Sequence, residues 1–173
     1  MRQGNDLVLV RPKKSRRAHE QDCGYLTTKA GERWPCIDVT RASEITEAVS
    51  GANVLWLDEP FMFVEDPPGQ LFDVVSEIQS YATVLMSTIT ATSERIPISR
   101  SVSDLLAASD KVIDCYGDCD CCGQFNEATR SWHLAGIKSV AIKVGGESIY
   151  EPRCPDCWNK GLLELVGILQ SAS

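Results

Sequence analysis

Two stretches in the last third of the chain, Cys119-Asp-Cys-Cys122 and Cys154-Pro-Asp-Cys157, decide how it is organised. Each is a C-x-x-C unit, a spacing that lets two thiolates converge on one cation from a tight turn. Two such turns complete a tetrahedron around zinc. The sequence therefore predicts a structural Zn²⁺ site with four ligands, Cys119, Cys122, Cys154 and Cys157.

The same spacing leaves alternatives open. Cys121 lies inside the first unit and could replace Cys119 or Cys122 as a ligand. Two disulfides, or two unrelated redox motifs, would also produce paired cysteines. Between the units lie a polar stretch, an alternating run at 137–144 and a Gly-Gly pair, which is content typical of a zinc ribbon. We favour the shared zinc site because paired C-x-x-C units in an intracellular protein are a specific signal.

Composition limits the class of protein. The chain has 173 residues, of which 43% are hydrophobic, enough for the core of one domain with a small appendage. Its net charge of -7, from 24 acidic and 17 basic residues, argues against general binding to nucleic acid. The first apolar run has only four residues, too short for the apolar region of a signal peptide, and no run in the sequence is long enough to span a membrane. We expect a cytoplasmic protein that does not bind membranes.

Short apolar runs alternate with amphipathic segments along the first two thirds of the chain. The runs predict strands at 7–10, 36–39, 54–57, 83–86 and 111–115. The amphipathic segments predict helices at 40–51, 70–81 and 103–109, and a further apolar helix at 161–170. Residues 18–35 are polar and weakly patterned, which predicts a long loop or flap. This alternation is typical of an α/β domain with a mostly parallel sheet. Cys36 and Cys115 adjoin apolar runs, so we expect both to be core residues.

The strand predicted at 54–57 runs directly into two carboxylates, Asp58 and Glu59. This is the Walker B pattern of P-loop nucleotidases, in which the first carboxylate holds Mg²⁺ and the second orients or deprotonates the nucleophile. The phosphate-binding sequence that should accompany it, G-x-x-x-x-G-K-[ST], does not occur in the 173 residues. Without that loop the β- and γ-phosphates of ATP have no cradle.

A Walker B strand followed by a two-knuckle zinc ribbon resembles the type II thymidine kinases. The run Leu57-Asp-Glu-Pro-Phe-Met-Phe63 resembles the family's I-D-E-[AG]-Q-F-F. The resemblance implies that Glu59 is the general base on the nucleoside 5'-hydroxyl and that Asp58 is the carboxylate on the metal side. The run from Val144 to Cys157 is similar to I-G-G-x-x-x-Y-x-x-x-C-x-x-C, the family's lasso over the nucleoside. It implies substrate contacts from Gly146 and Tyr150.

A third segment, 87–98, lies where the family has A-L-D-G-T-F-Q-R-K-P-F. Thr92, Arg95 and Pro97 match this pattern, and Arg95 is the substrate-side residue that the match implies. The segment also departs from the family, because Thr90 replaces the aspartate and Ser93 replaces the aromatic residue expected to pack on the base. Near the flap, Lys29 falls where the family often carries a His-Asp pair.

The resemblance implies a P-loop-NTPase-like, mostly parallel sheet that lacks its first strand and phosphate loop, with a C-terminal zinc ribbon, or lasso, subdomain. We divide the chain into an α/β domain at 1–115, the lasso subdomain at 116–160 and a C-terminal helix at 161–173. Zn²⁺ is the implied structural cofactor, and Mg²⁺ and ATP bind only if the missing loop is supplied. Type II thymidine kinases are commonly tetramers, so a homo-oligomer is the implied assembly.

Three functions remain as hypotheses. The first is ATP-dependent phosphoryl transfer to the 5'-hydroxyl of thymidine or a related deoxynucleoside, with the sequence beginning downstream of the phosphate loop; the 173-residue chain is then inactive by itself. The second is a degenerate, non-catalytic pseudokinase that keeps the fold and the zinc site as a binding or scaffold protein. The third is an unrelated zinc-ribbon module that binds nucleic acid, which the acidic composition disfavours.

Overall fold

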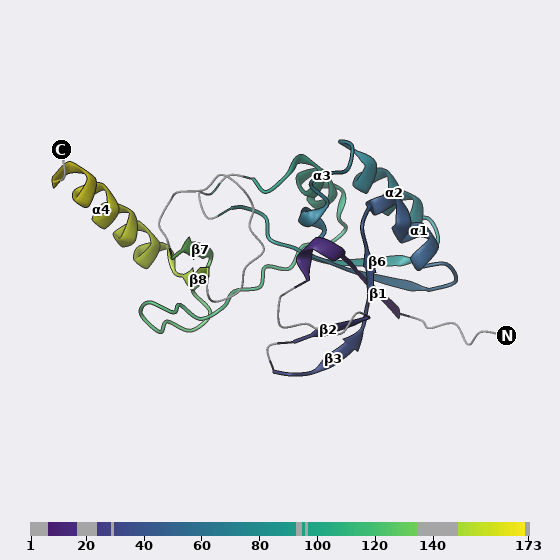
Figure 1. The fold of residues 1–173 in the computed structure, drawn as a ribbon, viewed down its shortest axis with the longest axis horizontal. Helices are drawn as coiled ribbons and strands as arrows, with labels where there is room; N and C mark the ends of the chain where they lie inside the picture. The colour runs from purple at the N-terminus through teal and green to yellow at the C-terminus, as the bar shows by residue number, and fades with distance from the viewer. Residues whose placement is uncertain are drawn as a thin grey trace. The chain divides into compact units, whose positions relative to one another are not determined.

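The computed structural model describes residues 7–16, 24–28, 30–92, 95, 97–134 and 149–171. The chain forms two compact units (Figure 1). The first, here called the sheet unit, comprises Met1–Thr90 and Pro97–Ser109. The second, the cysteine unit, comprises Ala91–Ile96 and Asp110–Ser173.

The sheet unit is built on four parallel strands in the order β4-β1-β5-β6. Their bounds are Leu7–Pro12 for β1, Ile37–Val39 for β4, Val54–Asp58 for β5 and Thr83–Ser87 for β6. All four lie where apolar runs predicted strands. The α/β fold with a mostly parallel sheet is therefore confirmed, and the carboxyl ends of β5 and β6 lie side by side.

Helices cover one face of this sheet (Figure 1). They are α1 (Ile45–Ala48), α2 (Gln70–Gln79) and α3 (Arg100–Ala108), and a 3₁₀ turn, η2 (Ala42–Glu44), leads into α1. The spacing that predicted α2 decides its buried side, because Leu71, Val74, Val75 and Ile78 are all buried. Ser99 caps α3 by accepting a hydrogen bond from the backbone N–H of Val102 at 3.2 Å. The core lies between these helices and the inner face of the sheet.

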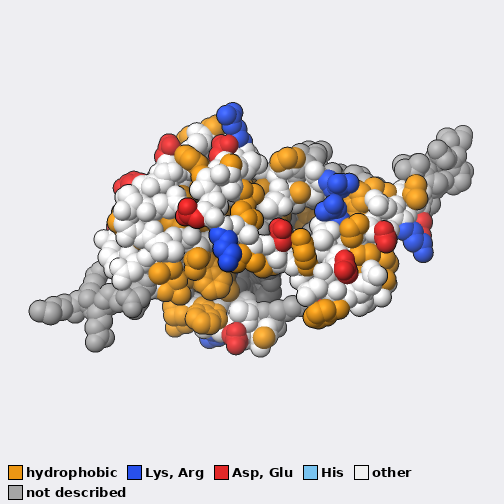
Figure 2. Space-filling model, turned by 180° about the vertical axis from the view of Figure 1, so that it is seen from behind, with side chains coloured by type: hydrophobic (Ala, Val, Ile, Leu, Met, Phe, Trp, Pro, Cys, Tyr) orange, Lys and Arg blue, Asp and Glu red, His pale blue; other side chains and the backbone are white. Residues whose placement is uncertain are grey.

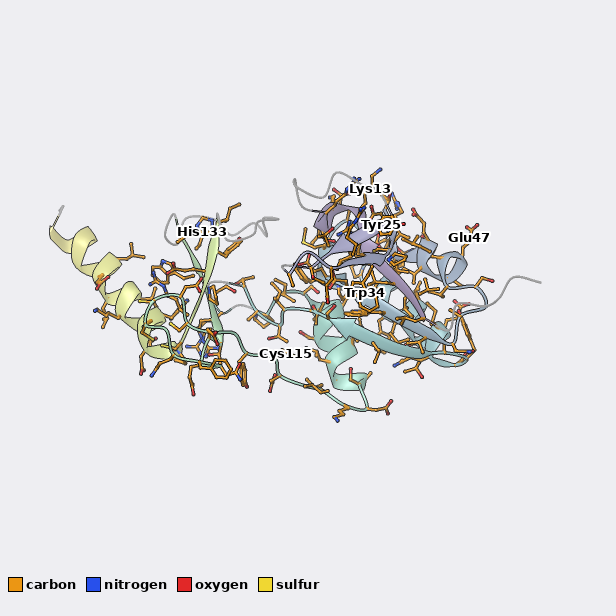
Figure 3. The ribbon with its side chains drawn as sticks, turned by 90° about the horizontal axis from the view of Figure 1, so that it is seen from below. Lys13, Tyr25, Trp34, Glu47, Cys115 and His133 are labelled. Carbon is orange, nitrogen blue, oxygen red and sulfur yellow. The ribbon has the colours of Figure 1, made fainter. Side chains whose placement is uncertain are left out.

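Residues 18–35 are predicted to be a long loop or flap, and a plain loop is wrong for the second part, where β2 (Tyr25–Thr27) and β3 (Arg33–Pro35) form an antiparallel hairpin. Gly31, at φ 86°, allows the tight turn between them. The hairpin is attached to the sheet through Arg11 of β1, whose Nη2 donates to the carbonyl of Tyr25 at 3.2 Å. The hairpin buries no apolar face, since side chains such as that of Trp34 (Figure 3) are exposed. Its sequence therefore lacks the alternation of apolar and polar residues that predicts a strand.

The strand predicted at 111–115 is also wrong. These residues are irregular and exposed, with Val112 and Ile113 at 54% and 68% exposure, and none of them pairs with another strand of the described part of the chain. An apolar run becomes a strand only if a partner strand satisfies its backbone hydrogen bonds. Cys115 (labelled in Figure 3) is consequently exposed rather than in the core, whereas Cys36 is buried as expected.

The cysteine unit contains a two-stranded antiparallel sheet, β7 (Arg130–His133) and β8 (Tyr150–Arg153), followed by α4 (Pro155–Ser171). The helix predicted at 161–170 thus begins six residues earlier, where Pro155 occupies the first helical position. The run at 137–144 lies outside the described residues. Within the described part of the chain, no helix is long and apolar enough to cross a membrane.

Hydrophobic side chains are also found on the surface. Val64, Tyr81 and Leu85 of the sheet unit are each at least half exposed. On the face drawn in Figure 2, hydrophobic side chains are interspersed with single acidic and basic ones.

Candidate functional site

The four predicted zinc ligands lie together in the cysteine unit. The Sγ atoms of Cys119, Cys122, Cys154 and Cys157 are all within 4.8 Å of one another, and those of Cys122 and Cys154 are 3.8 Å apart. Sulfurs that surround a tetrahedral zinc ion at the usual Zn–S distance of ~2.3 Å are about 3.8 Å from each other. The four thiols therefore form a set that could hold a structural zinc ion, and soft thiolate donors suit that metal.

Two tight turns bring these sulfurs together. In the first, the backbone N–H of Gly123 donates to the carbonyl of Cys119 at 2.8 Å, and Gly123 adopts a φ of 73° that a glycine accommodates without strain. The second lies at the start of α4, where the N–H of Cys157 points to Cys154 Sγ at 3.5 Å. The N–H of Cys154 in turn donates to Cys119 Sγ at 3.2 Å, which joins the two turns.

The sulfurs differ in how readily they ionise. Burial opposes ionisation of Cys119, but hydrogen bonds from the backbone N–H groups of Cys154, Cys122 and Cys121 outweigh it and lower its pKa to about 6. The pKa of Cys157 is raised, first by its hydrogen bond with Cys121 and then by those with the other thiols. Crowded thiols of this kind cannot all ionise unless a cation compensates their charge.

The four sulfurs that lie within 4.8 Å of one another are those of Cys119, Cys122, Cys154 and Cys157. Cys121 is not in this group, although its thiol is close enough to that of Cys157 to raise the pKa of Cys157. The four-sulfur group thus contains the regular pair, Cys119 with Cys122. The described cysteines are all free thiols, so the disulfide alternative finds no support among them.

Aromatic side chains pack beside the cysteine cluster. Trp132 of β7 and Trp158 of α4 are buried, and their rings meet edge to face with centroids 6.3 Å apart. The guanidinium carbon of Arg153 lies 4.4 Å from the centroid of the Trp132 ring. Arg153 also forms an ion pair with Glu151.

The three predicted substrate residues are in different situations. Tyr150 opens β8 and is half-buried, and its ring meets the His133 ring edge to face at 5.1 Å (His133 is labelled in Figure 3). Arg95 is exposed, has a φ of 65°, and holds its guanidinium carbon 5.9 Å from the ring of Trp158. Gly146 lies outside the described residues.

The acidic pair ends strand β5 in the sheet unit. Asp58 is the last residue of the strand and is half-buried. Glu59 follows in the left-handed region, at φ 49° and ψ 45°, which is uncommon for a residue other than glycine. Its N–H donates to the carbonyl of Ser87 at 2.8 Å, and the buried 3₁₀ turn η3 (Pro60–Met62) fixes the chain that follows.

A serine and a tryptophan that the sequence did not indicate complete this arrangement. Ser87 ends β6 and is the register partner of Asp58. Its Oγ donates to Asp58 Oδ1 at 2.5 Å and accepts from the indole Nε1 of Trp56 at 3.0 Å. The oxygen atoms gathered at these strand ends are of the hard type that Mg²⁺ prefers. Only the pairing of β5 with β6 reveals this contact, because 29 residues separate Asp58 from Ser87.

Comparison with known proteins agrees with these features. The sequence model of the family described as thymidine kinase matches residues 1–158. A thymidine kinase of Chloroflexus aurantiacus is 27% identical over 140 residues, which cover 78% of this chain and 71% of that protein. One of Halobacterium salinarum is 28% identical over 163 residues, covering 89% and 79%. One of monkeypox virus is 25% identical over 138 residues, covering 77% and 71%. On this evidence, the chain belongs to the thymidine kinase family.

Proposed function

We propose that this protein is a thymidine kinase-like protein whose chemistry is ATP-dependent phosphoryl transfer to the 5'-hydroxyl of thymidine or a related deoxynucleoside. The observation that carries the proposal is the acidic pair Asp58–Glu59 at the carboxyl end of a parallel strand, in a chain that belongs to this family. In open α/β sheets, ligands bind at that edge.

Glu59 is the proposed general base. Its carboxylate takes the proton from the 5'-hydroxyl as the hydroxyl oxygen forms its bond to the γ-phosphorus, and the bond from that phosphorus to the oxygen bridging to the β-phosphate breaks. Asp58 is the proposed ligand of Mg²⁺, directly or through water; when bound, that ion neutralises the charge on the phosphates.

The nucleoside is proposed to lie under the lasso that contains Gly146 and Tyr150, with Arg95 on the substrate side. Zn²⁺ on Cys119, Cys122, Cys154 and Cys157 is proposed to be structural and to hold the base of that lasso. The four-sulfur geometry supports this role. A homotetramer located in the cytoplasm completes the proposal, by resemblance to the family.

We further propose that these 173 residues by themselves do not transfer phosphate, because they contain no G-x-x-x-x-G-K-[ST] sequence to cradle the β- and γ-phosphates. A non-catalytic role as a binding or scaffold protein is the second candidate. The departures at Lys29, Thr90 and Ser93 favour it, since at these positions the family pattern has a His-Asp pair, an aspartate and the aromatic residue expected to pack on the base.

Two measurements on the zinc-loaded 173-residue chain test these proposals. Thymidine binding, measured by calorimetry, is expected in the wild type and should weaken in Tyr150→Ala; no binding would contradict the nucleoside site. Transfer of labelled phosphate from ATP to thymidine is expected to be absent. If transfer occurs and Glu59→Gln abolishes it, the chain is a complete kinase and the proposed inactivity is wrong.

A further inference from the structure

Ser87 contacts both members of the acidic pair, although it lies 29 residues after Asp58 in the sequence. Its side-chain Oγ donates to Asp58 Oδ1 at 2.5 Å, and its backbone carbonyl accepts from the N–H of Glu59 at 2.8 Å. The first contact fixes the orientation of a carboxylate. The second supports the left-handed backbone that carries Glu59 away from the strand. One residue at the end of β6 therefore holds two groups at the end of β5.

The direction of the hydrogen bonds follows from donor chemistry. An indole Nε1–H can only donate, so the contact of 3.0 Å between Trp56 and Ser87 makes the serine oxygen the acceptor. The hydroxyl has a single proton, and Asp58 Oδ1 is the acceptor within reach of it. Trp56 thus orients Ser87, and Ser87 presents its proton to an ionised carboxylate, which is the stronger kind of hydrogen bond.

Packing within the sheet holds Trp56, the hydrogen-bond donor to Ser87, in place. Trp56 lies in the middle of the described sheet, with Leu9 of β1 as its register partner on one side and Leu85 of β6 on the other. The Trp56 side chain is half-buried, and its indole N–H points toward Ser87 at the end of β6. Asp58, also half-buried, accepts the serine's hydrogen bond at Oδ1, and its Oδ2 has no hydrogen bond to any of the described residues.

We propose that Ser87, oriented by Trp56, is a positioning residue for metal binding at Asp58: it fixes the carboxylate so that Oδ2 faces a divalent cation or its coordinated water. This inference rests on the proposed role of Asp58 as the metal-side carboxylate. Groups that orient a metal ligand through a hydrogen bond commonly change metal affinity by roughly 10- to 100-fold when removed.

The test uses the zinc-loaded full chain labelled with ¹⁵N at tryptophan, with Mn²⁺ as a paramagnetic probe. Trp56→Phe assigns the Trp56 indole signal among those of the four tryptophans. Mn²⁺ should broaden this signal saturably. Ser87→Ala should raise the Mn²⁺ concentration at half-broadening by about 10-fold and shift the indole signal. Ser87→Thr, which restores the hydroxyl, should return the midpoint close to that of the wild type.

Three variants separate the possible results. Thr83→Ala, at the other end of β6, should leave the midpoint unchanged and controls for general effects on the strand. Asp58→Asn should abolish the broadening of the Trp56 signal. Ser87→Cys keeps the size of the side chain and a weak donor, and gives an intermediate midpoint even if Ser87→Ala does not fold.

The outcomes distinguish the inference from the function it rests on. If Asp58→Asn abolishes broadening but Ser87→Ala and Ser87→Cys keep the wild-type midpoint, the positioning role is overturned and the metal role of Asp58 stands. The positioning role is likewise overturned if Ser87→Thr fails to restore the midpoint. If the wild-type signal is not broadened, or Asp58→Asn changes nothing, the metal role of Asp58 is itself overturned.

Discussion

Gly161 of α4 lies directly against the indole of Trp132 in β7: a Cβ at Gly161 would come within 2.8 Å of Cη2 of that ring. The same added carbon would come within 2.7 Å of Arg153 Nη1. The arginine can move, but the tryptophan is 8% exposed and is packed against Trp158. The absence of a side chain at Gly161 is thus what lets the helix approach the sheet of the cysteine unit.

Gly161→Ala should therefore destabilise the cysteine unit. Helix propensity alone predicts a gain of about 1 kcal/mol from glycine to alanine, whereas overpacking against a fixed ring costs about 1–3 kcal/mol. We expect a net loss of roughly 1 kcal/mol, seen as a lower midpoint when the near-UV signal of the tryptophans is followed through urea unfolding. Lys160→Ala, an exposed change on the same helix, should leave the midpoint nearly unchanged; equal midpoints for both variants would contradict the close contact.

The cysteine cluster should bind about one zinc ion per chain. Cys119→Ser and Cys154→Ser should each remove most of the bound zinc, because a tetrahedral site that loses one thiolate loses much of its affinity. Chelation of the ion should disorder the cysteine unit, since structural zinc contributes about 10 kcal/mol or more of binding free energy to local folding. Zinc content after purification under reducing conditions measures the first effect, and circular dichroism measures the second.

Cys121→Ser is the matched control for the zinc prediction, because it removes a neighbouring thiol that lies outside the four-sulfur set. This variant should retain the full zinc content. If it loses zinc while Cys122→Ser retains it, Cys121 is the ligand and the set of four is different from the one described.

Arg11 and Asp38 form an ion pair in the sheet unit that links β1 to β4. The Nε atom of Arg11 lies 2.7 Å from Asp38 Oδ1, and the arginine is only 2% exposed. Asp38→Ala leaves a buried cation without this partner, so we expect a loss of about 3–5 kcal/mol in the free energy of unfolding. Arg11→Met combined with Asp38→Ala should cost less than Asp38→Ala alone, because no buried charge remains. A double variant less stable than Asp38→Ala would count against a desolvated pair.

Glu59 adopts an unfavourable backbone conformation directly after β5. Its φ of 49° costs a residue with a Cβ about 1–2 kcal/mol relative to glycine. Glu59→Gly should thus have a free energy of unfolding about 1 kcal/mol higher than Glu59→Ala, which removes the same carboxylate but keeps a Cβ. Asn126, at φ 55°, provides the comparison, because asparagine tolerates this region and Asn126→Gly should gain less over the wild type. Thermal unfolding of these variants tests this, and a Glu59→Gly variant no more stable than Glu59→Ala would contradict the strain at this position.

Local pattern was enough to locate most of the secondary structure. The strands β1, β5 and β6 follow from short apolar runs, and α2 follows from buried positions spaced three and four residues apart. The C-x-x-C spacing likewise identified the four thiols that meet in the cysteine unit. These features depend on residues close in sequence, so the sequence carries their signal directly.

The local sequence pattern predicted secondary structure wrongly where that structure depends on contacts with residues distant in the sequence. The run at 111–115 is as apolar as a strand but has no neighbour to pair with among the described residues. The hairpin of β2 and β3 has no apolar face, and contacts such as that of Arg11 with the Tyr25 carbonyl stabilise it instead. The helix α4 begins at Pro155 because the second cysteine turn opens directly into it.

The sequence alone determined which residues are the candidates for the chemistry: four thiols in two turns and two carboxylates after a strand. Only the tertiary structure decided what surrounds them. Strand register placed Ser87 opposite Asp58, and the turn around Cys119 left Cys121 outside the four-sulfur set. Packing set Gly161 against Trp132. The physical reason is that each of these arrangements depends on how whole strands, turns and helices pair and pack, which no local pattern encodes.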